Sequence, residues 1–171
     1  GGPIQNVQRA FELFGVGREG SVLLTDGSPA YPEVAATNEM HHLLCAHHFS
    51  ALIMDAQKGL GHRATDFRVR ANKAIFKAFA DEGALEIHIS EMCRDYAEYP
   101  KASTFLSTLE KCKRQVCLTF TAKYFTAGHV STQRGESTNS RIKGKGTLND
   151  ELETSSLVVS VNIVLDVTSR Q

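Results

Sequence analysis

Residues 21–45 read SVLLTDGSPAYPEVAATNEMHHLLC, and the order of elements in this stretch decides the fold. Its apolar run SVLLT lies between glycines and predicts a buried strand, with Asp26 at the carboxyl end. The run HHLLC at 41–45 predicts a second strand. Between them SPAYPEVAAT predicts a helix, because Ser28 can cap it and Pro32 is tolerated if it stays within the first turn.

A strand, a helix and a strand in this order predict a crossover between parallel strands, whose carboxyl ends open onto one side of the sheet. Asp26 and Cys45 would both emerge at that edge. Upstream, residues 5–14 place apolar side chains at helical spacing, and glycines then end the helix. We therefore expect an α/β fold in which helices flank short parallel strands.

The pattern becomes helical from Phe49 to about Phe125. The side chains that step by three or four along it are Ala51, Leu52 and Asp55, then Val69, Asn72, Phe76 and Phe79, then Phe105, Leu109, Cys112 and Val116. Breaks are expected at Gly59 and Gly61, at 81–83, and at Tyr99 with Pro100. No period recurs, so the block predicts an all-helical insertion of about four helices rather than a repeat array.

Composition is that of one soluble domain, since 42% of the 171 residues are hydrophobic and 22% are charged. The formal net charge is +0, so any attraction to nucleic acid must come from a local patch. A candidate patch is a stretch whose only acids are Glu110 and Glu136. Its cations are Lys101, Lys111, Lys113, Arg114, Lys123, Arg134, Arg141, Lys143 and Lys145.

The cysteines, Cys45, Cys93, Cys112 and Cys117, are irregularly spaced and no secretory leader precedes them. This pattern favours reduced thiols in a reducing compartment over a disulfide scaffold. No apolar run approaches the roughly 20 residues that a bilayer-spanning helix needs. We therefore expect no membrane partner.

Two carboxylates are candidate catalytic residues, and each has a simpler interpretation. Asp26 precedes Gly27, and such a pair can simply make a turn. Glu136 lies in STQRGESTNSRIKGKG at 131–146, which can form a solvated surface helix or a flexible basic linker. If both carboxylates bind metal, two Mg²⁺ or Mn²⁺ ions could activate water and stabilise a leaving alkoxide in phosphodiester cleavage.

Cys45 and His48 form a C-x-x-H pair, with further histidines beside it at 41, 42 and 47. A zinc site needs four ligands, so a distant Cys93, Cys112, Cys117 or His88 would have to complete it. The alternative is a packed thiol and a hydrogen-bonded imidazole. The sequence has no Walker loop, no G-x-G-x-x-G and no G-x-S-x-G.

These segments together resemble the core of Mutator-like transposases, a family that includes domesticated relatives, the plant far-red impaired response regulators. The shared pattern is a strand ending in T-D, a C-x-x-H after the next strand, a helical insertion, and a T-Q-R-x-E-x-x-N signature. Here these residues are Thr25 and Asp26, Cys45 and His48, and Thr132, Gln133, Arg134, Glu136 and Asn139. The similarity covers about 11–152, and the last signature is the specific one.

The resemblance implies a truncated RNase H-like fold that carries the all-helical insertion. It also implies a site of two Asp and one Glu that binds two Mg²⁺ or Mn²⁺ ions and cleaves and joins DNA strands. Asp26 matches the second Asp and Glu136 the final Glu, while Cys45 and His48 match a pair near the active site that binds zinc or is structural. The expected DNA contacts are Arg134, Asn139, Arg141, Lys143 and Lys145. DNA is thus the expected partner, with self-association as an option, in the nucleus if the source is eukaryotic and otherwise inside the cell.

The sequence departs from the family pattern in two places. First, the family's first Asp lies on a strand upstream of the helix that begins this sequence, so only two of the three carboxylates have a match here. Second, after residue 152 the family continues as a helix, whereas LVVSVNIVLDV at 157–167 alternates like a strand. We therefore divide the chain into an RNase H-like portion without its first strands, 1–48, a helical insertion, 49–128, a catalytic-Glu helix, 129–152, and a divergent tail, 153–171.

Three functions remain open on this pattern. The first is a fragment of a Mutator-like transposase catalytic domain that is inactive alone. The second is a domesticated DNA-binding or transcription-regulatory protein without catalysis. The third is a relic without biochemical activity, which exposed sheet edges would make prone to aggregation.

Overall fold

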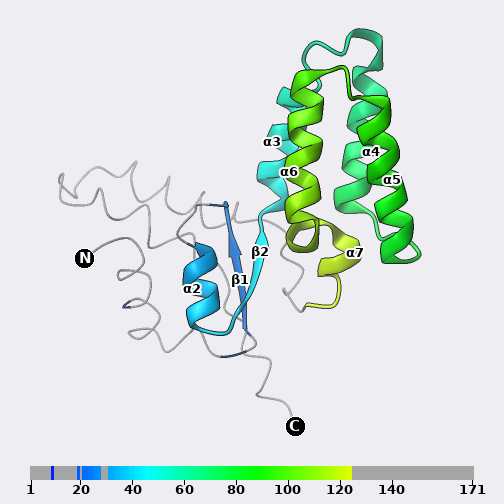
Figure 1. Cartoon of the computed structure of the whole chain (residues 1–171). Helices are drawn as coiled ribbons and strands as arrows, with labels where there is room; N and C mark the ends of the chain where they lie inside the picture. The colour runs from blue at the N-terminus through cyan, green and yellow to red at the C-terminus, as the bar shows by residue number, and fades with distance from the viewer. Residues whose placement is uncertain (1–8, 10–18, 20, 28–30, 125–171) are drawn as a thin grey trace, which may run out of the picture. The chain divides into compact units, whose positions relative to one another are not determined.

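The computed structural model describes residues 9, 19, 21–27 and 31–124 (Figure 1). In these residues the protein is mixed α/β, mostly helical, with a short two-stranded parallel sheet. The chain divides into two compact units, one of residues 1–45 with 124–171 and one of residues 46–123. The expected combination of parallel strands and a helical block is confirmed at this level.

The first unit contains β1 (Val22–Thr25), α2 (Tyr31–Thr37) and β2 (His41–Leu44). The strands pair in parallel, with Val22 opposite His41 and Thr25 opposite Leu44. The predicted strand, helix and strand are therefore confirmed, although each strand is one residue shorter than expected. Pro32 lies in the first turn of α2, where it removes no helical hydrogen bond. The expected cap Ser28 lies outside the described residues, as does the helix expected at 5–14 except for residue 9, which is helical and exposed.

All four residues of β1 are buried, which is typical of a strand in a parallel sheet. Val22 and Leu24 pack with Leu43 of β2, and Tyr124 covers this cluster. Since side chains alternate across a strand, Leu23 and Thr25 lie on the opposite face. The sheet therefore has apolar or hydrogen-bonded side chains on both faces.

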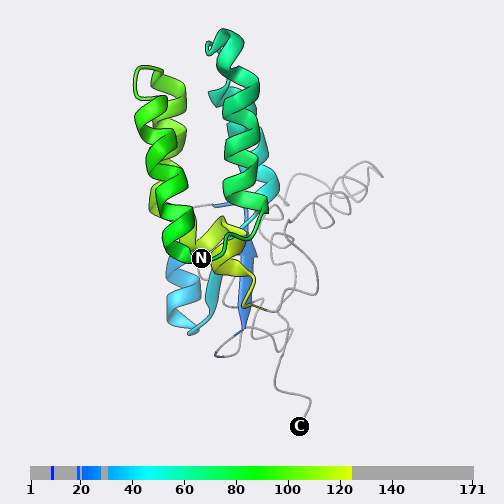
Figure 2. The same cartoon turned by 90° about the vertical axis from the view of Figure 1, so that its right-hand side faces the viewer.

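The second unit is built from α3 (Ala46–Ala56), the 3₁₀ turn η1 (Gly61–Arg63), α4 (Ala64–Phe76), α5 (Glu82–Asp95), α6 (Pro100–Val116) and α7 (Leu118–Thr121). Its long helices stand side by side as a bundle, and each contacts the helix before and after it (Figures 1 and 2). The ring closes because α6 also packs on α3. Short connections make neighbouring helices antiparallel, as in up-down bundles.

The connections lie where the sequence predicted breaks. Gly59 and Gly61 have φ of +91° and +54°, a region that side chains disfavour, and they separate α3 from α4. Asp81 caps α5, and Pro100 occupies the first turn of α6, where its missing N–H costs nothing. Each of these local signals therefore ends or begins a helix of the bundle.

Aromatic rings fill the bundle core. Phe67 is fully buried and lies edge-on to both Tyr96 and Phe105, with ring centroids 5.0 and 5.7 Å away. Phe49 joins them at 6.5 Å from Phe105. Such edge-to-face pairs add to the stabilisation that burial alone gives. The rings thereby connect α3, α4 and α6 with Tyr96, the residue that ends α5.

The buried faces of α3 and α4 differ from the expected ones. The expected residues of α3, Ala51, Leu52 and Asp55, are exposed, whereas Ala46, Phe49, Ile53 and Ala56 are buried. In α4 Val69 is 59% exposed, whereas Phe67, Ala71, Ala74 and Ile75 are buried, and Phe79 lies beyond the helix end. Alanines provide much of both buried faces, and their small side chains gave a weak apolar signal. The stripe predicted on α6 is confirmed at Phe105, Leu109 and Val116.

Removing the cap of α5 should cost about 1 kcal/mol of bundle stability. The Asp81 carboxylate accepts a hydrogen bond from the Ala84 N–H at 2.7 Å, satisfying an otherwise unbonded donor at the helix start. We expect Asp81→Ala to lower the free energy of unfolding in urea by this amount, and Asp81→Asn, which keeps the acceptor, to lower it less. Equal losses in both variants would show that the cap bond is not responsible.

Candidate functional site

The candidate site is the carboxyl edge of the two-stranded sheet. Asp26 follows β1 and Cys45 follows β2, and the register that pairs Thr25 with Leu44 makes them neighbours across the strands. The Cys45 N–H donates to the Thr25 carbonyl at 2.7 Å, extending the ladder to this point. Asp26 is exposed, whereas Cys45 is only 1% exposed. The structure thus places both residues at one edge, as the strand order predicted.

Asp26 begins a tight turn. Gly27 has φ of +94°, and a Cβ at this position would contact the Leu44 side chain at 3.7 Å. The Gly27 N–H donates to the Thr25 hydroxyl at 3.3 Å. The Asp-Gly pair therefore makes the turn of the simpler interpretation, and this turn leaves the Asp26 carboxylate exposed at the sheet edge.

No role for His42 is predicted from the sequence, but in the structure it contacts β1, the strand that leads to Asp26. Its Nε2 lies 2.8 Å from the hydroxyl oxygen of Thr25, a fully buried residue. Burial lowers the pKa of His42, so its ring is held in the neutral form. The alternation of side chains along a strand could have indicated this contact. The register aligns His42 with Leu23, so His42 lies on the same face of the sheet as Thr25.

We expect His42 to titrate below the pH at which an exposed histidine does. Because its pKa is lower in the folded than in the unfolded protein, the unfolded chain binds this proton first as the pH falls. The free energy of unfolding should therefore be unaffected by His42 above its unfolded pKa and should decrease as the pH falls through the folded pKa. Histidine ring shifts followed by NMR against pH check this, with a short unfolded peptide that contains the His42 segment as the reference. A pKa of His42 in the folded protein at or above that in the peptide would contradict it.

The C-x-x-H pair spans the start of α3. We expected helix only from Phe49, but α3 begins at Ala46, so His47 and His48 lie in its first turn. The buried stripe explains this, since Ala46 continues the face of Phe49 and Ile53 by one turn. Cys45 is buried, as the packed-thiol alternative requires.

The distant residues that could complete a zinc site with Cys45 and His48 all lie in the second unit. Burial raises the pKa of Cys112 to about 11 and that of Cys117 to about 12, so both thiols stay protonated at neutral pH. His88 Nε2 lies 3.0 Å from the Arg70 carbonyl, and Cys93 is exposed on α5. Within residues 21–27 and 31–124, no three His, Cys, Asp or Glu side chains are grouped as metal ligands.

The second half of the candidate site lies outside the described residues. These positions are Glu136 and the expected DNA contacts Arg134, Asn139, Arg141, Lys143 and Lys145. The same holds for the strand expected at 157–167. Their roles remain predictions from the sequence.

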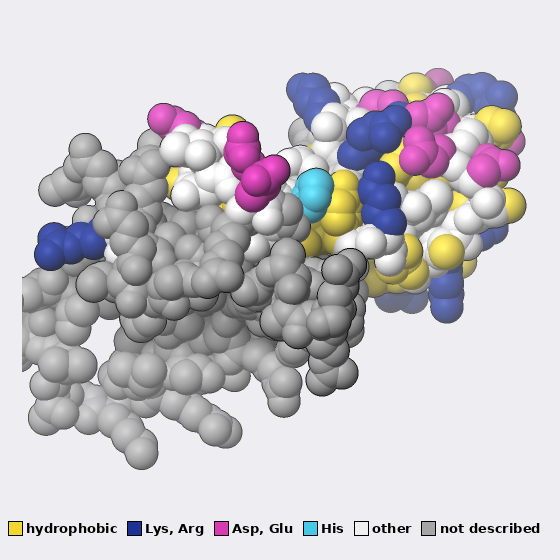
Figure 3. All heavy atoms as spheres, turned by 90° about the horizontal axis from the view of Figure 1, so that it is seen from below, with side chains coloured by type: hydrophobic (Ala, Val, Ile, Leu, Met, Phe, Trp, Pro, Cys, Tyr) yellow, Lys and Arg dark blue, Asp and Glu magenta, His cyan; other side chains and the backbone are white. Residues whose placement is uncertain are grey.

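Two of the cations expected to form a patch on α6, Lys113 and Arg114, are paired with acids. Lys113 lies 2.7 Å from Glu110 and 3.1 Å from Glu86, and Arg114 lies 3.4 Å from Glu82. Glu82 and Glu86 come from α5, outside the stretch that looked poor in acids. Figure 3 shows Lys and Arg interspersed with Asp and Glu over the visible face of the bundle. These two cations therefore add little net positive charge to the predicted patch.

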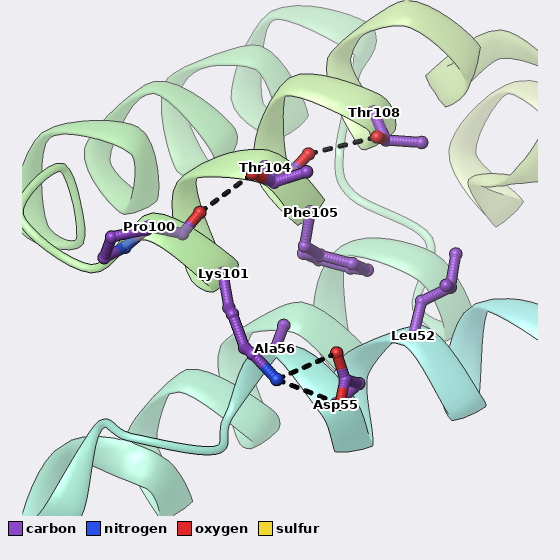
Figure 4. Close-up of a pocket in the computed structure, with 8 residues that line it drawn as sticks. All are labelled: Leu52, Asp55, Ala56, Pro100, Lys101, Thr104, Phe105 and Thr108. Atoms are coloured by element: carbon purple, nitrogen blue, oxygen red, sulfur yellow. Dashed lines mark hydrogen bonds and ion pairs between the residues drawn. The ribbon is translucent and has the colours of Figure 1, made fainter.

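A groove of about 270 Å³ lies between α3 and α6 (Figure 4). Leu52 and Phe105 provide its apolar walls, and Lys101 reaches across one end to Asp55 at 3.4 Å. Hydrogen bonds from Lys58 and Lys101 lower the pKa of Asp55, so this carboxylate is ionised and paired. The Thr104 hydroxyl donates to the Pro100 carbonyl rather than into the groove. The groove is thus an apolar surface closed by an ion pair, without a pair of groups suited to acid–base chemistry.

Comparisons of the chain with models of protein families, with curated proteins and with solved structures found no match. Among the helices of the described residues, none combines the length and apolar character needed to cross a membrane.

Proposed function

We propose that the chain is a fragment of a Mutator-like DNA transposase catalytic domain, and that residues 21–45 belong to an RNase H-like fold. One observation carries the proposal. Asp26 lies at the carboxyl edge of a parallel strand pair, and the second strand leads directly into a separate helical bundle. This is the order that the resemblance requires, with T-D, then C-x-x-H, then an all-helical insertion.

The residues at the sheet edge fit the divalent cations of this family. Asp26 supplies exposed carboxylate oxygens, the donors that Mg²⁺ and Mn²⁺ prefer, at the strand ends where ligands of α/β sheets bind. Glu136 is the proposed second ligand. A bound Mg²⁺ or Mn²⁺ would supply the Lewis acidity for attack of water or a DNA hydroxyl on a phosphodiester. The family's site has a further Asp, so Asp26 and Glu136 alone are not expected to cleave DNA.

DNA contact is assigned to residues 134–145 rather than to the bundle. Three cations of α6 each lie within 3.4 Å of an acid: Lys101 near the start of the helix, and Lys113 and Arg114 near its end. They therefore offer little net charge to a phosphate backbone. Arg134, Arg141 and Lys143 follow one another without an intervening acid except Glu136. A role on chromosomal DNA would place the protein in the nucleus of a eukaryotic source.

Binding of Mn²⁺ tests the proposal. We expect the chain to bind Mn²⁺ weakly, measured as loss of the free-ion signal in electron paramagnetic resonance, and each of Asp26→Asn and Glu136→Gln to abolish the saturable part. Glu33→Gln is the matched control, because Glu33 is an exposed carboxylate of the same unit on α2. Unchanged binding in both site variants would remove the metal role.

Retention on DNA separates the proposal from the domesticated alternative. A protein that only holds DNA should be retained at low salt, lose retention steeply as salt rises, and be indifferent to Asp26→Ala. That result, together with the absence of Mn²⁺ binding, would favour a DNA-binding protein without catalysis.

A further inference from the structure

We propose that Thr25 and His42 are positioning residues for Asp26: their side chains clamp the turn that presents the Asp26 carboxylate to a divalent cation. The inference deepens the proposed function and rests on it for the metal. The clamp itself rests on contacts within the first unit.

Thr25 is held from β2 at two points. Its carbonyl accepts a hydrogen bond from the Cys45 N–H at 2.7 Å, and its hydroxyl oxygen lies 2.8 Å from His42 Nε2. The first bond is an ordinary ladder bond, which any residue at position 25 would make. The second needs a hydroxyl on β1 and a polar side chain of the right reach on β2, so it depends on the identity of both side chains.

The same hydroxyl also holds the far side of the turn. The Gly27 N–H donates to the Thr25 hydroxyl oxygen at 3.3 Å, bridging over Asp26. In the neutral tautomer that carries its proton on Nδ1, His42 accepts the hydroxyl proton at Nε2, so this hydroxyl can donate to His42 while it accepts from Gly27. Asp26 therefore lies between two residues that are both tied to one hydroxyl, and its backbone has little freedom.

A strand with only a structural role would not need a buried hydroxyl at position 25. Thr25 is fully buried, and Val would have nearly the same shape there without a polar atom. A buried hydroxyl is costly unless it is bonded, and here the hydroxyl is bonded both to the turn and to the neighbouring strand. Hydrogen bonds that orient a metal ligand from behind are typically worth 10- to 100-fold in metal affinity.

The neighbouring histidine provides a matched control. His41 lies on the opposite face of β2, where its ring is 4.5 Å from that of Tyr124. His41→Leu therefore removes an imidazole from the same strand without touching Thr25. His42→Leu removes the clamp, and His42→Gln restores a polar group at the reach of Nε2.

The test measures Mn²⁺ affinity and, without metal, the hydrogen exchange of the Gly27 amide by NMR. We expect Thr25→Val and His42→Leu each to weaken Mn²⁺ binding about 10-fold and to speed Gly27 exchange, with the double variant no worse than either single one. Thr25→Ser, His42→Gln and His41→Leu should stay within about threefold of the unmodified protein, because each keeps a hydroxyl at position 25 and a polar partner for it at position 42.

The outcomes separate the clamp from the proposed function. Mn²⁺ binding that depends on Asp26 but is unchanged in Thr25→Val would overturn the positioning role and leave the metal site intact. Binding that never depends on Asp26 would overturn both, while Gly27 exchange would still report whether the clamp forms. If Thr25→Val unfolds the unit, the comparison of His42→Leu with His42→Gln decides: equal loss in both overturns the proposal, and recovery in His42→Gln supports it.

Discussion

Phe67→Ala should destabilise the helical bundle by about 3–5 kcal/mol. Phe67 is fully buried, and its ring meets Tyr96 and Phe105 edge-on at 5.0 and 5.7 Å. Truncation removes the apolar contacts and leaves a cavity between α4 and α6, which the surrounding rings cannot fill without leaving their rotamers. Urea unfolding followed by circular dichroism at 222 nm measures the loss.

A change on the other face of the same helix provides the control. Val69 is 59% exposed, so Val69→Ala should change the free energy of unfolding by no more than about 0.5 kcal/mol. If Phe67→Ala also costs less than about 1 kcal/mol, the aromatic cluster would not be the centre of the bundle.

Local signals in the sequence predicted where most elements begin and end. SVLLT and HHLLC, bounded by turn residues, appear as the parallel strands β1 and β2. Pro100 begins α6, and Gly59 and Gly61 interrupt the chain between α3 and α4. These signals work because they act through the backbone of a few adjacent residues, before any tertiary contact is made.

The buried faces of the helices were harder to predict, because packing partners decide them. Val69 and Leu52 are apolar but exposed, whereas Ala71 and Ala74 are fully buried. An alanine carries little hydrophobic signal in a sequence, yet its small size lets neighbouring helices approach closely. The buried face predicted for α4 was therefore wrong because the prediction relied on large apolar side chains without knowing which helix lies opposite.

At the candidate site too, contacts between elements distant in the sequence limited what could be predicted. The position of Asp26 follows from strand order alone, since carboxyl ends of parallel strands share an edge. The bond between Thr25 and His42 requires the strand register, which the sequence does not state. Likewise the pairing of Arg114 with Glu82 depends on how α5 and α6 align. The sequence of the basic stretch alone therefore could not predict that this cation is paired with an acid.

Residues 46–123 should fold without the rest of the chain, whereas residues 46–98 should not. The longer fragment retains the whole closed ring of helices with its buried core, which is what an independent domain needs. The shorter one lacks α6, whose Phe105, Leu106 and Leu109 are buried against the bundle. We expect a cooperative urea transition for 46–123 and little helix for 46–98, measured by circular dichroism.

The same fragment shows whether the bundle is energetically independent of the sheet unit. If it is, Phe67→Ala should cost the same in residues 46–123 as in the full chain, within about 0.5 kcal/mol. A fragment that is unfolded, or a cost that falls sharply in it, would show that the bundle needs residues outside 46–123 for its stability.

An insertion that folds by itself can separate two parts of a catalytic site in sequence without disturbing either. Independent folding would therefore explain how Asp26 and Glu136 could belong to one site although the bundle lies between them in the chain.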